Sequence, residues 1–310
     1  LCNPQGQAIP LQTEVLACWP DQSVKWGLFD FQADVAAHTR AEYTLIANRE
    51  HAASMTPELI TSLLVKKDAD SFQIDTGAAI FTVPTRRFAP FSSVMIDGQE
   101  RLDAANSCVS FEDDAGRQYE HHIEQARVET SGALRITLNI DGQIRRPDSD
   151  ANFARFAARL HFYAHSAACR IDYTLHNPNA AQHLNGLWDL GDSGSIYFND
   201  LSFHVAAHSQ NLQIVWNDDV LGASPRIAAG TMSIYQDSSG GDHWMSRNHV
   251  NRLGKVAHRF QGYRVTQGDA VISSGKRANP LVALQQNGIR IEAAIRDFWQ
   301  NFPKELEATP

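Results

Sequence analysis

The sequence predicts a mostly β protein, in which a small N-terminal barrel-like unit precedes a larger antiparallel β-sandwich. Three observations support this expectation. Short segments of alternating apolar and polar residues recur along most of the 310-residue chain, Gly and Asx turns separate them, and few segments keep a helical period. Hydrophobic residues make up 43% of the chain and charged residues 20%, which is enough apolar material for a sizeable core.

The first elements belong to the barrel-like unit. Residues 15–31, VLACWPDQSVKWGLFDF, predict two strands joined by a turn at Pro20-Asp21. Residues 40–47 predict a further strand, and residues 56–66 show the best helical period in the chain. We place this domain and its connector at residues 1–62.

The larger domain is placed at residues 63–304. Residues 72–83, FQIDTGAAIFTV, predict two short strands around Gly77. The remaining predicted strands are residues 107–111, 134–140, 156–163, 169–175, 195–205 and 210–216.

The C-terminal residues 305–310 are expected to begin a further domain. The aromatic residues of RDFWQNFPKELE, residues 296–307, are therefore expected at the exit from the sandwich, covered by core or by that domain.

Composition excludes several classes of protein. A formal net charge of -8 argues against nucleic acid as a partner, and no apolar run is long enough to span a membrane. The four cysteines have long, irregular spacings, which argues against a zinc site. No signal peptide is visible in the first residues.

Residues 176–201, HNPNAAQHLNGLWDLGDSGSIYFNDL, combine turn signals with aspartates. Such Asx-Gly runs usually form turns, and an aspartate cluster can also hold calcium through oxygen ligands, although the spacing here does not match a calcium loop. Trp188 is either a core residue or a platform for a sugar ring.

Residues 237–255, DSSGGDHWMSRNHVNRLGK, contain almost no apolar residues around one tryptophan. The glycine pair can expose backbone N–H groups, but the spacing of a nucleotide-phosphate loop is absent. Trp244 in polar company fits a carbohydrate better, because an aromatic ring stacks on the apolar face of a sugar while polar neighbours bind its hydroxyls. The alternative is an ordinary solvated loop.

Residues 262–280, GYRVTQGDAVISSGKRANP, add possible proton-transfer groups and fixed cations. Lysine can act as an acid or a base when its surroundings change its pKa, and arginine binds carboxylates bidentately. Taken alone, each of these cations is typical of an ordinary surface charge. Together with residues 237–255, they predict a cationic, aromatic-lined site on an acidic protein, which suits an anionic ligand.

Several of these stretches together resemble one known family. WPDQSVKWGLFDF, GLWDLGDSGSIYFNDL, QDSSGGDHWMSRNH, the GYRV and GKRANP segments and RDFWQNFPKELE are similar to the exo-rhamnogalacturonan lyases, polysaccharide lyase family 26. The resemblance spans nearly the whole chain. It departs at Gln22, where a turn glycine is expected in WPDGS.

The resemblance implies a fold and an activity. It implies an N-terminal RIFT-type barrel, incomplete at its start, a central β-sandwich, and a C-terminal helical toroid that this chain lacks. It also implies a secreted or periplasmic lyase that cleaves a uronate-containing polysaccharide, most plausibly rhamnogalacturonan-type pectin, by β-elimination. Such chemistry needs cations that neutralise the uronate carboxylate, a base for the C5 proton and an acid for the leaving oxygen.

The residue types suggest the individual roles. The expected proton-transfer pair is His249 and Lys276, with Tyr263 as a substitute acid. The expected substrate-binding residues are Trp188, Trp244, Arg247, Asn248, Arg264 and Arg277. No cofactor is expected, with calcium as the alternative. The competing functions are a non-catalytic carbohydrate-binding or scaffold protein and a lyase for another uronate polymer.

Overall fold

The computed structural model confirms a mostly β protein. It describes residues 1–47, 63–149, 151–182, 191–209, 211–217, 224–228, 230–246, 249–251, 254, 258–286 and 288–310. These residues form 21 strands and one short 3₁₀ turn, Ala104–Asn106. The chain divides into two compact units, of which the first holds Leu1–Pro178 and Ile196–His208 and the second holds Asn179–Ser195 and Ser209–Pro310.

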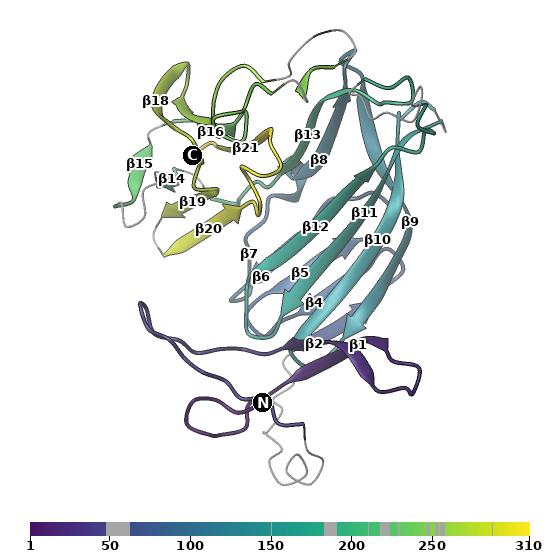
Figure 1. Cartoon of the computed structure of the whole chain (residues 1–310), viewed down its shortest axis with the longest axis vertical. Coiled ribbons are helices and arrows are strands. Elements are labelled where there is room, and N and C mark those ends of the chain that lie inside the picture. Colours follow the sequence, from purple (N-terminus) through teal and green to yellow (C-terminus); the bar gives the residue numbers. More distant parts are fainter. Residues whose placement is uncertain are drawn as a thin grey trace. The chain divides into compact units, whose positions relative to one another are not determined.

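An N-terminal hairpin opens the first unit (Figure 1). Strands β1 (Gln12–Cys18) and β2 (Val24–Asp30) pair antiparallel, as the sequence predicts. In the turn between them, Gln22 has φ 68°, a left-handed conformation that favours glycine. The departure from WPDGS therefore places a side chain in a conformation that glycine adopts with less strain.

Two expectations for this region differ from the structure. Residues 40–47 form no strand, and Thr44 makes only an isolated bridge with Cys2. Of the segment with the helical period, residues 56–62 lie outside the described residues, and its end enters strand β3 (Leu64–Lys67). A single strand pair buries little apolar surface, so the apolar pattern of residues 40–47 is not enough to add them to the hairpin as a third strand.

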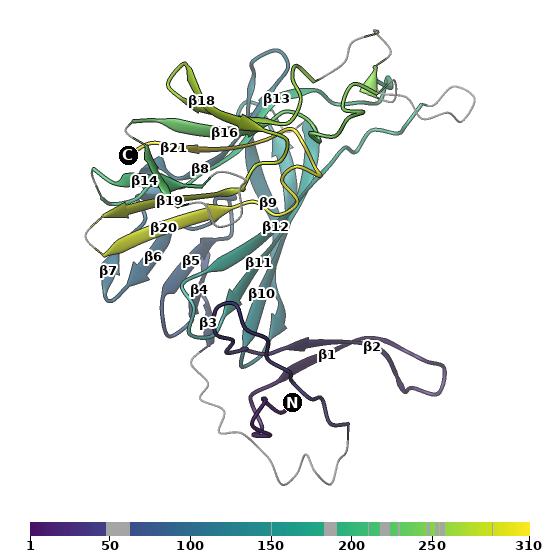
Figure 2. The ribbon, with the colours of Figure 1, turned by 60° about the vertical axis from the view of Figure 1, so that its left-hand side comes forward.

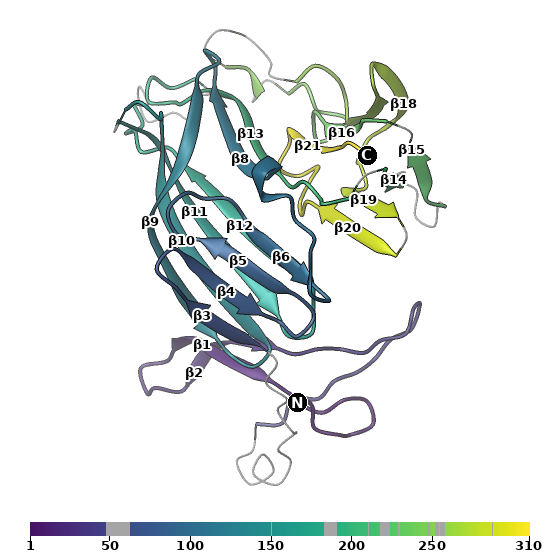
Figure 3. The ribbon, with the colours of Figure 1, turned by 180° about the vertical axis from the view of Figure 1, so that it is seen from behind.

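Two sheets pack face to face in the first unit (Figure 3). The six-stranded sheet has the order β12-β11-β10-β9-β8-β13, and the five-stranded sheet has the order β3-β4-β5-β6-β7. The strands after β3 are β4 (Ser71–Asp75), β5 (Ile80–Pro84), β6 (Ser93–Ile96), β7 (Gln99–Glu100), β8 (Cys108–Asp113), β9 (Gln118–Ser131), β10 (Arg135–Arg145), β11 (Asn152–Tyr163), β12 (Cys169–His176) and β13 (Phe198–His204).

The core of this sandwich follows the period of two in its strands. In β10, Ile136, Leu138 and Ile140 point into the core and are at most 1% exposed, while Thr137 and Asn139 point to the other face of the sheet and are buried there. The rings of Tyr173 on β12 and Phe203 on β13 lie 5.3 Å apart, although these strands stand at opposite ends of the six-stranded sheet. The sheet therefore curls around its core.

The second unit is a separate, smaller sandwich of two four-stranded sheets (Figure 2). Their orders are β15-β14-β19-β20 and β18-β17-β16-β21. Their core contains Trp216, Ile234, Tyr263 and Phe298, among other apolar residues. The strands are β14 (Gln213–Trp216), β15 (Arg226–Ala228), β16 (Met232–Gln236), β17 (Tyr263–Gln267), β18 (Ala270–Gly275), β19 (Leu281–Gln286), β20 (Ile289–Ala294) and β21 (Lys304–Ala308).

The expected boundaries differ from this division. The sequence suggests one sandwich from residue 63 to residue 304, whereas the structure has two units with separate cores. Residues 305–308 do not leave the fold, because β21 pairs with β16 and buries Leu306. The segment KELEA alternates, so that one face of the strand is apolar. Its three charged residues made it look like a surface segment in the sequence.

No helix among the described residues is long and apolar enough to cross a membrane.

Candidate functional site

A loop after β16 forms the centre of the candidate site, and β16, β17 and the end of β18 hold it in place. Asp237 N donates to Gly262 O at 2.9 Å, and Gly262 N donates to Ser238 Oγ at 2.8 Å. The described residues of the polar stretch beginning at Asp237 thus pack beside the segment beginning at Gly262. The sequence predicts that these two segments form one site.

Two glycines allow the backbones of these segments to touch. Gly240 has φ 72°, and a Cβ built on it would lie 1.9 Å from the carbonyl oxygen of Lys276. Gly262 has φ 76°, and its Cβ would lie 2.0 Å from the carbonyl oxygen of Gly275. The sequence predicts a glycine pair that exposes backbone N–H groups; in the structure Gly240 lets the loop approach the backbone of Lys276, directly after β18.

Gln236 joins the same two segments and was not singled out from the sequence. Its side chain is fully buried, and Nε2 donates to Ser238 O at 2.6 Å and to Lys276 O at 2.9 Å. Its Oε1 accepts from Ala278 N at 2.9 Å. One amide therefore fixes the backbone on both sides of Lys276 and Arg277. No sequence pattern marks a glutamine at a strand end as buried, so the role of Gln236 could not be predicted.

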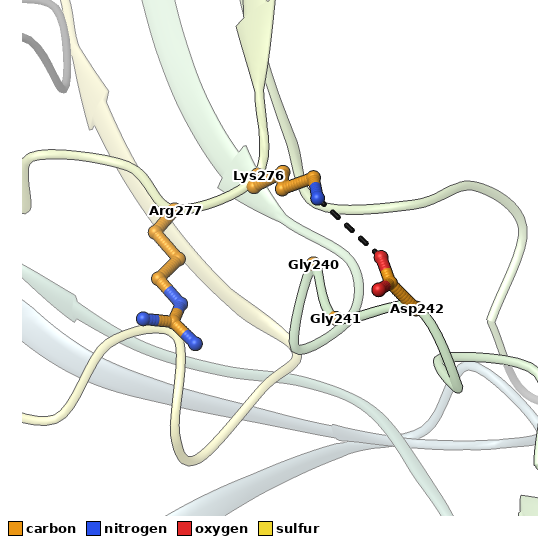
Figure 4. Close-up of a pocket in the computed structure, with 5 residues that line it drawn as sticks. All are labelled: Gly240, Gly241, Asp242, Lys276 and Arg277. Carbon is orange, nitrogen blue, oxygen red and sulfur yellow. Dashed lines mark hydrogen bonds and ion pairs between the residues drawn. The ribbon is translucent and has the colours of Figure 1, made fainter.

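A pocket of about 490 Å³ lies where these segments meet, lined by Gly240, Gly241, Asp242, Lys276 and Arg277 (Figure 4). Lys276 Nζ lies 3.4 Å from Asp242 Oδ1, and both side chains are mostly exposed. The guanidinium of Arg277 extends away from this ion pair and stacks over the ring of Trp299 at 3.8 Å. Two adjacent cations thus face different sides of the pocket.

The aromatic residues of the C-terminal segment support this region instead of an exit from the fold. Phe298 is 1% exposed in the core, and Trp299 lies beneath Arg277. The ring of Phe302 packs against His258 at 4.8 Å. The core covers Phe298, which is one of the two environments that the sequence analysis expects, and Trp299 and Phe302 contact Arg277 and His258.

His249 lies beside this pocket's loop, not among the residues that line the pocket. Its Nδ1 is 3.0 Å from the carbonyl oxygen of Trp244, and Trp244 N donates to Gly241 O at 3.2 Å. Both side chains are partly buried. The turn from Gly241 to Trp244 thus connects His249 to the pocket through the backbone.

Two other predicted residues take positions away from the pocket. Tyr263 is 2% exposed and belongs to the core of the second unit, so its hydroxyl is in no position to meet a polymer there. Arg264 lies on the outside of β17, and its guanidinium stacks over Phe260 at 4.0 Å. Alternation along β17 separates these neighbours onto opposite faces.

Three further predicted binding residues, Trp188, Arg247 and Asn248, lie outside the described residues. Nearby, a hydrogen bond from Arg259 to Tyr235 raises the pKa of Arg259 above its usual value, and Arg259 adds another cation beside the loop. We did not identify Arg259 from the sequence.

The aspartates considered for calcium make hydrogen bonds within the protein. Asp192 accepts from the backbone N–H groups of Gln182 and Gly194, and Asp200 accepts from the hydroxyls of Ser110 and Ser202. These contacts are typical of turns and strand pairs. In the described part of the chain, no group of three or more His, Cys, Asp or Glu side chains could hold a metal ion.

The described fold defines an all-β protein with an N-terminal hairpin and a curled β-sandwich. Comparison with known families finds a match for each of these two parts. Residues 1–48 match the PcRGLX-like N-terminal RIFT barrel domain, and residues 63–194 match the PcRGLX-like protein central beta sandwich domain. The chain belongs to this PcRGLX-like family, which confirms the resemblance to exo-rhamnogalacturonan lyases. Neither domain match includes residues 237–277, which contain the candidate site.

A relative in Bacillus subtilis (strain 168), "Uncharacterized protein YetA", is 25% identical over 174 residues. The aligned region covers 53% of this chain and 19% of the relative. The chain therefore spans about a fifth of that relative, whose name states no activity.

Proposed function

We propose that the protein is a secreted or periplasmic polysaccharide lyase that cleaves a uronate-containing polymer by β-elimination, with rhamnogalacturonan-type pectin as the first candidate substrate. The observation that carries the proposal is the pocket between Gly240 and Arg277, where two adjacent cations stand against a glycine loop on a protein of net charge -8. Family membership supports the reaction class.

The proposed roles follow from the contacts. Arg277, stacked on Trp299, presents a planar fork that fits a uronate carboxylate. Lys276 adds a second positive charge. Its ammonium already faces Asp242, so we assign it to electrostatic stabilisation in preference to the proton-transfer role expected from the sequence. Neutralising the carboxylate stabilises the negative charge that develops when the C5 proton leaves.

His249 is the proposed base. In the reaction, the base takes the C5 proton, the C4–O4 bond breaks, a C4=C5 double bond forms and O4 takes a proton. No co-reactant is required. Trp244 remains the proposed stacking platform for a sugar ring next to His249.

The test is the ultraviolet absorbance of unsaturated uronate, measured with full-length protein on rhamnogalacturonan, homogalacturonan, alginate and a neutral polymer. We expect product from rhamnogalacturonan and none from the neutral polymer. Product from another uronate alone would change the substrate but keep the reaction. Tight binding to these polymers with no product would overturn the lyase and favour a carbohydrate-binding protein.

A further inference from the structure

A second histidine lies against His249. The rings of His249 and His258 are 5.0 Å apart, centre to centre, and nearly perpendicular at 87°. Phe302 packs edge-on against both rings, at 6.1 Å from His249 and 4.8 Å from His258. Both histidines are partly exposed.

Backbone carbonyls select the same tautomer in both neutral rings. His249 Nδ1 is 3.0 Å from Trp244 O, and His258 Nδ1 is 2.9 Å from Asp237 O. A carbonyl oxygen only accepts, so each Nδ1 carries the hydrogen. In each neutral ring the lone pair then sits on Nε2, which can take a proton and later return it.

The position of His258 is fixed by a buried carboxylate. Asp237 is 2% exposed, and its Oδ2 accepts the backbone N–H groups of Arg259 and Phe260 at 2.6 and 3.0 Å. The same residue's carbonyl accepts from His258. Asp237, directly after β16, therefore holds His258 in two ways. It binds the His258 side chain and the backbone N–H groups of the next two residues.

The two anchors lie on one short segment. Residues 237–244 supply the carbonyl that binds His258 at one end and the carbonyl that binds His249 at the other, and Gly240, Gly241 and Asp242 between them line the pocket. This segment organises the cationic pocket and the histidine pair together.

We propose that His258 is the second proton-transfer residue of this site, an inference that rests on the proposed lyase function. The reaction begins with His249 neutral and His258 protonated. His249 Nε2 takes the C5 proton, and His258 Nε2–H donates its proton to O4 as the C4–O4 bond breaks. The two rings have then exchanged protonation states, and proton transfer between them through solvent restores the starting state. Arg277 binds the carboxylate, and Lys276 adds positive charge to the site.

Asparagine provides a sharp test, because its amide nitrogen replaces Nδ1 of histidine and no group replaces Nε2. His258→Asn keeps the hydrogen bond to Asp237 O, and His249→Asn keeps the one to Trp244 O. His38→Asn is the matched control, since His38 is an exposed residue of the first unit with φ 60°, a conformation that asparagine tolerates. Full-length protein is used, and a melting curve accompanies each variant.

Two rates are measured with a uronate oligosaccharide in D₂O: formation of unsaturated product, and entry of deuterium at C5 followed by NMR. We expect His258→Asn to lower product formation on the order of 100-fold with little change in KM, while C5 exchange continues. His249→Asn should lose both rates, and His38→Asn neither. A structural role for His258 would leave the asparagine variant active.

The possible outcomes distinguish failure of the His258 proposal from failure of the proposed lyase function. If wild-type protein forms product and the rate of product formation by His258→Asn is within threefold of the wild-type rate, the role of His258 is overturned. The proposed lyase function then still stands. Loss of C5 exchange in His258→Asn, along with product, overturns its assignment as the acid. Wild-type protein that forms no product from any uronate overturns the proposed function and this role with it. If His258→Asn does not fold, His258→Gln takes its place, with the same expected rates.

Discussion

At the scale of single residues, Gly240 and Gly241 are adjacent but differ in what a side chain would meet. A Cβ at Gly240 would lie 1.9 Å from the Lys276 carbonyl oxygen, in a residue with φ 72°. At Gly241 the closest atom would be Ser239 Oγ at 3.6 Å, an ordinary contact. The pair therefore offers a matched test of how closely the loop packs against the backbone of Lys276.

We expect Gly240→Ala to lower the free energy of unfolding by about 2 kcal/mol or more, because the left-handed backbone alone costs about 1–2 kcal/mol for a residue with a Cβ. Gly241→Ala should change it by less than about 0.5 kcal/mol. Urea unfolding of both variants gives the comparison. Equal losses in the two variants would contradict the close contact between the loop and Lys276.

The stacking of Arg277 on Trp299 makes a separate prediction. Arg277→Lys keeps the charge but loses the planar fork, and a lost charge-assisted hydrogen bond is worth about 1.5–3 kcal/mol. KM for a uronate substrate should therefore rise about tenfold or more. Arg290→Lys, at an exposed ion pair with Glu292, is the control. An unchanged KM in Arg277→Lys would remove Arg277 from the binding site.

At the scale of elements, the β1–β2 hairpin is held to the sandwich of the first unit by a few polar side chains. Gln12 Oε1 accepts from the N–H groups of Leu134 and Arg135, and its Nε2 donates to Arg135 O. The Arg135 guanidinium, largely buried, pairs with Asp30 at 3.0 Å and Glu14 at 3.3 Å. The hairpin leaves many apolar side chains exposed, Trp19 and Trp26 among them, so these polar contacts carry much of its attachment.

Removing the Gln12 amide should loosen this attachment. In Gln12→Ala we expect amide hydrogen exchange in β1 and β2 to speed up about tenfold or more, while β10 and β11 keep their protection. Thr13→Ala, at the exposed neighbouring residue, should leave the exchange rates unchanged. Equal exchange in the Gln12 variant and wild type would show that the ion pairs of Arg135 alone hold the hairpin.

Elements with clear alternation could be predicted from the sequence, and those whose outward faces are charged could not. Residues 72–83 and 156–163 were recognised because apolar residues alternate there between Gly and Asx turns. Strand β9 was missed, since its sequence QYEHHIEQARVETS looks like a charged surface segment. Its inward face carries Tyr119 and His121, and pairing with β10 outweighs its weak local preference.

The contact between the two segments of the candidate site was predictable from the sequence, but the neighbours of their side chains were not. Polar residues and glycines clustered at residues 237–277 indicated two segments that meet. The sequence does not show which side chain turns toward which neighbour, so Lys276 was not expected to face Asp242. Tyr263 was not expected in the core, and His258 was not recognised, because its role depends on contacts with Asp237 and His249 that lie outside any local pattern.

At the scale of the whole molecule, stability should depend on pH through buried histidines of the first unit. His121 is 1% exposed, and its Nε2 lies 2.9 Å from the Tyr173 hydroxyl. Burial lowers the pKa of His121 from 6.5 to about 4, with a smaller contribution from Arg87. Burial also lowers the pKa of His161, against the opposing effect of Asp172.

The sign follows from where the proton binds. Below pH 6.5 the unfolded chain protonates His121 before the folded protein does, so stability is fully present above pH 6.5 and is lost as pH falls toward 4. Each unit of pKa difference corresponds to about 1.4 kcal/mol, which gives a loss of roughly 3 kcal/mol for His121. His121→Gln should flatten this dependence, as measured by urea unfolding between pH 7 and pH 4.

Exposed His38→Gln is the control for that experiment and should keep the wild-type slope. A His121 variant with an unchanged slope would mean that His121 binds its proton equally well in the folded and unfolded states, contrary to its burial.

The return of the chain to the first unit at Ile196–His208 has a consequence for biosynthesis. Strand β13 is translated after residues 179–195, which belong to the second unit, yet it closes the edge of β8 and brings Phe203 against Tyr173. A nascent chain emerging from the ribosome therefore carries an unpaired β8 edge until residue 208 is free. During that interval the growing polypeptide should depend on chaperones to keep this edge from pairing with other chains.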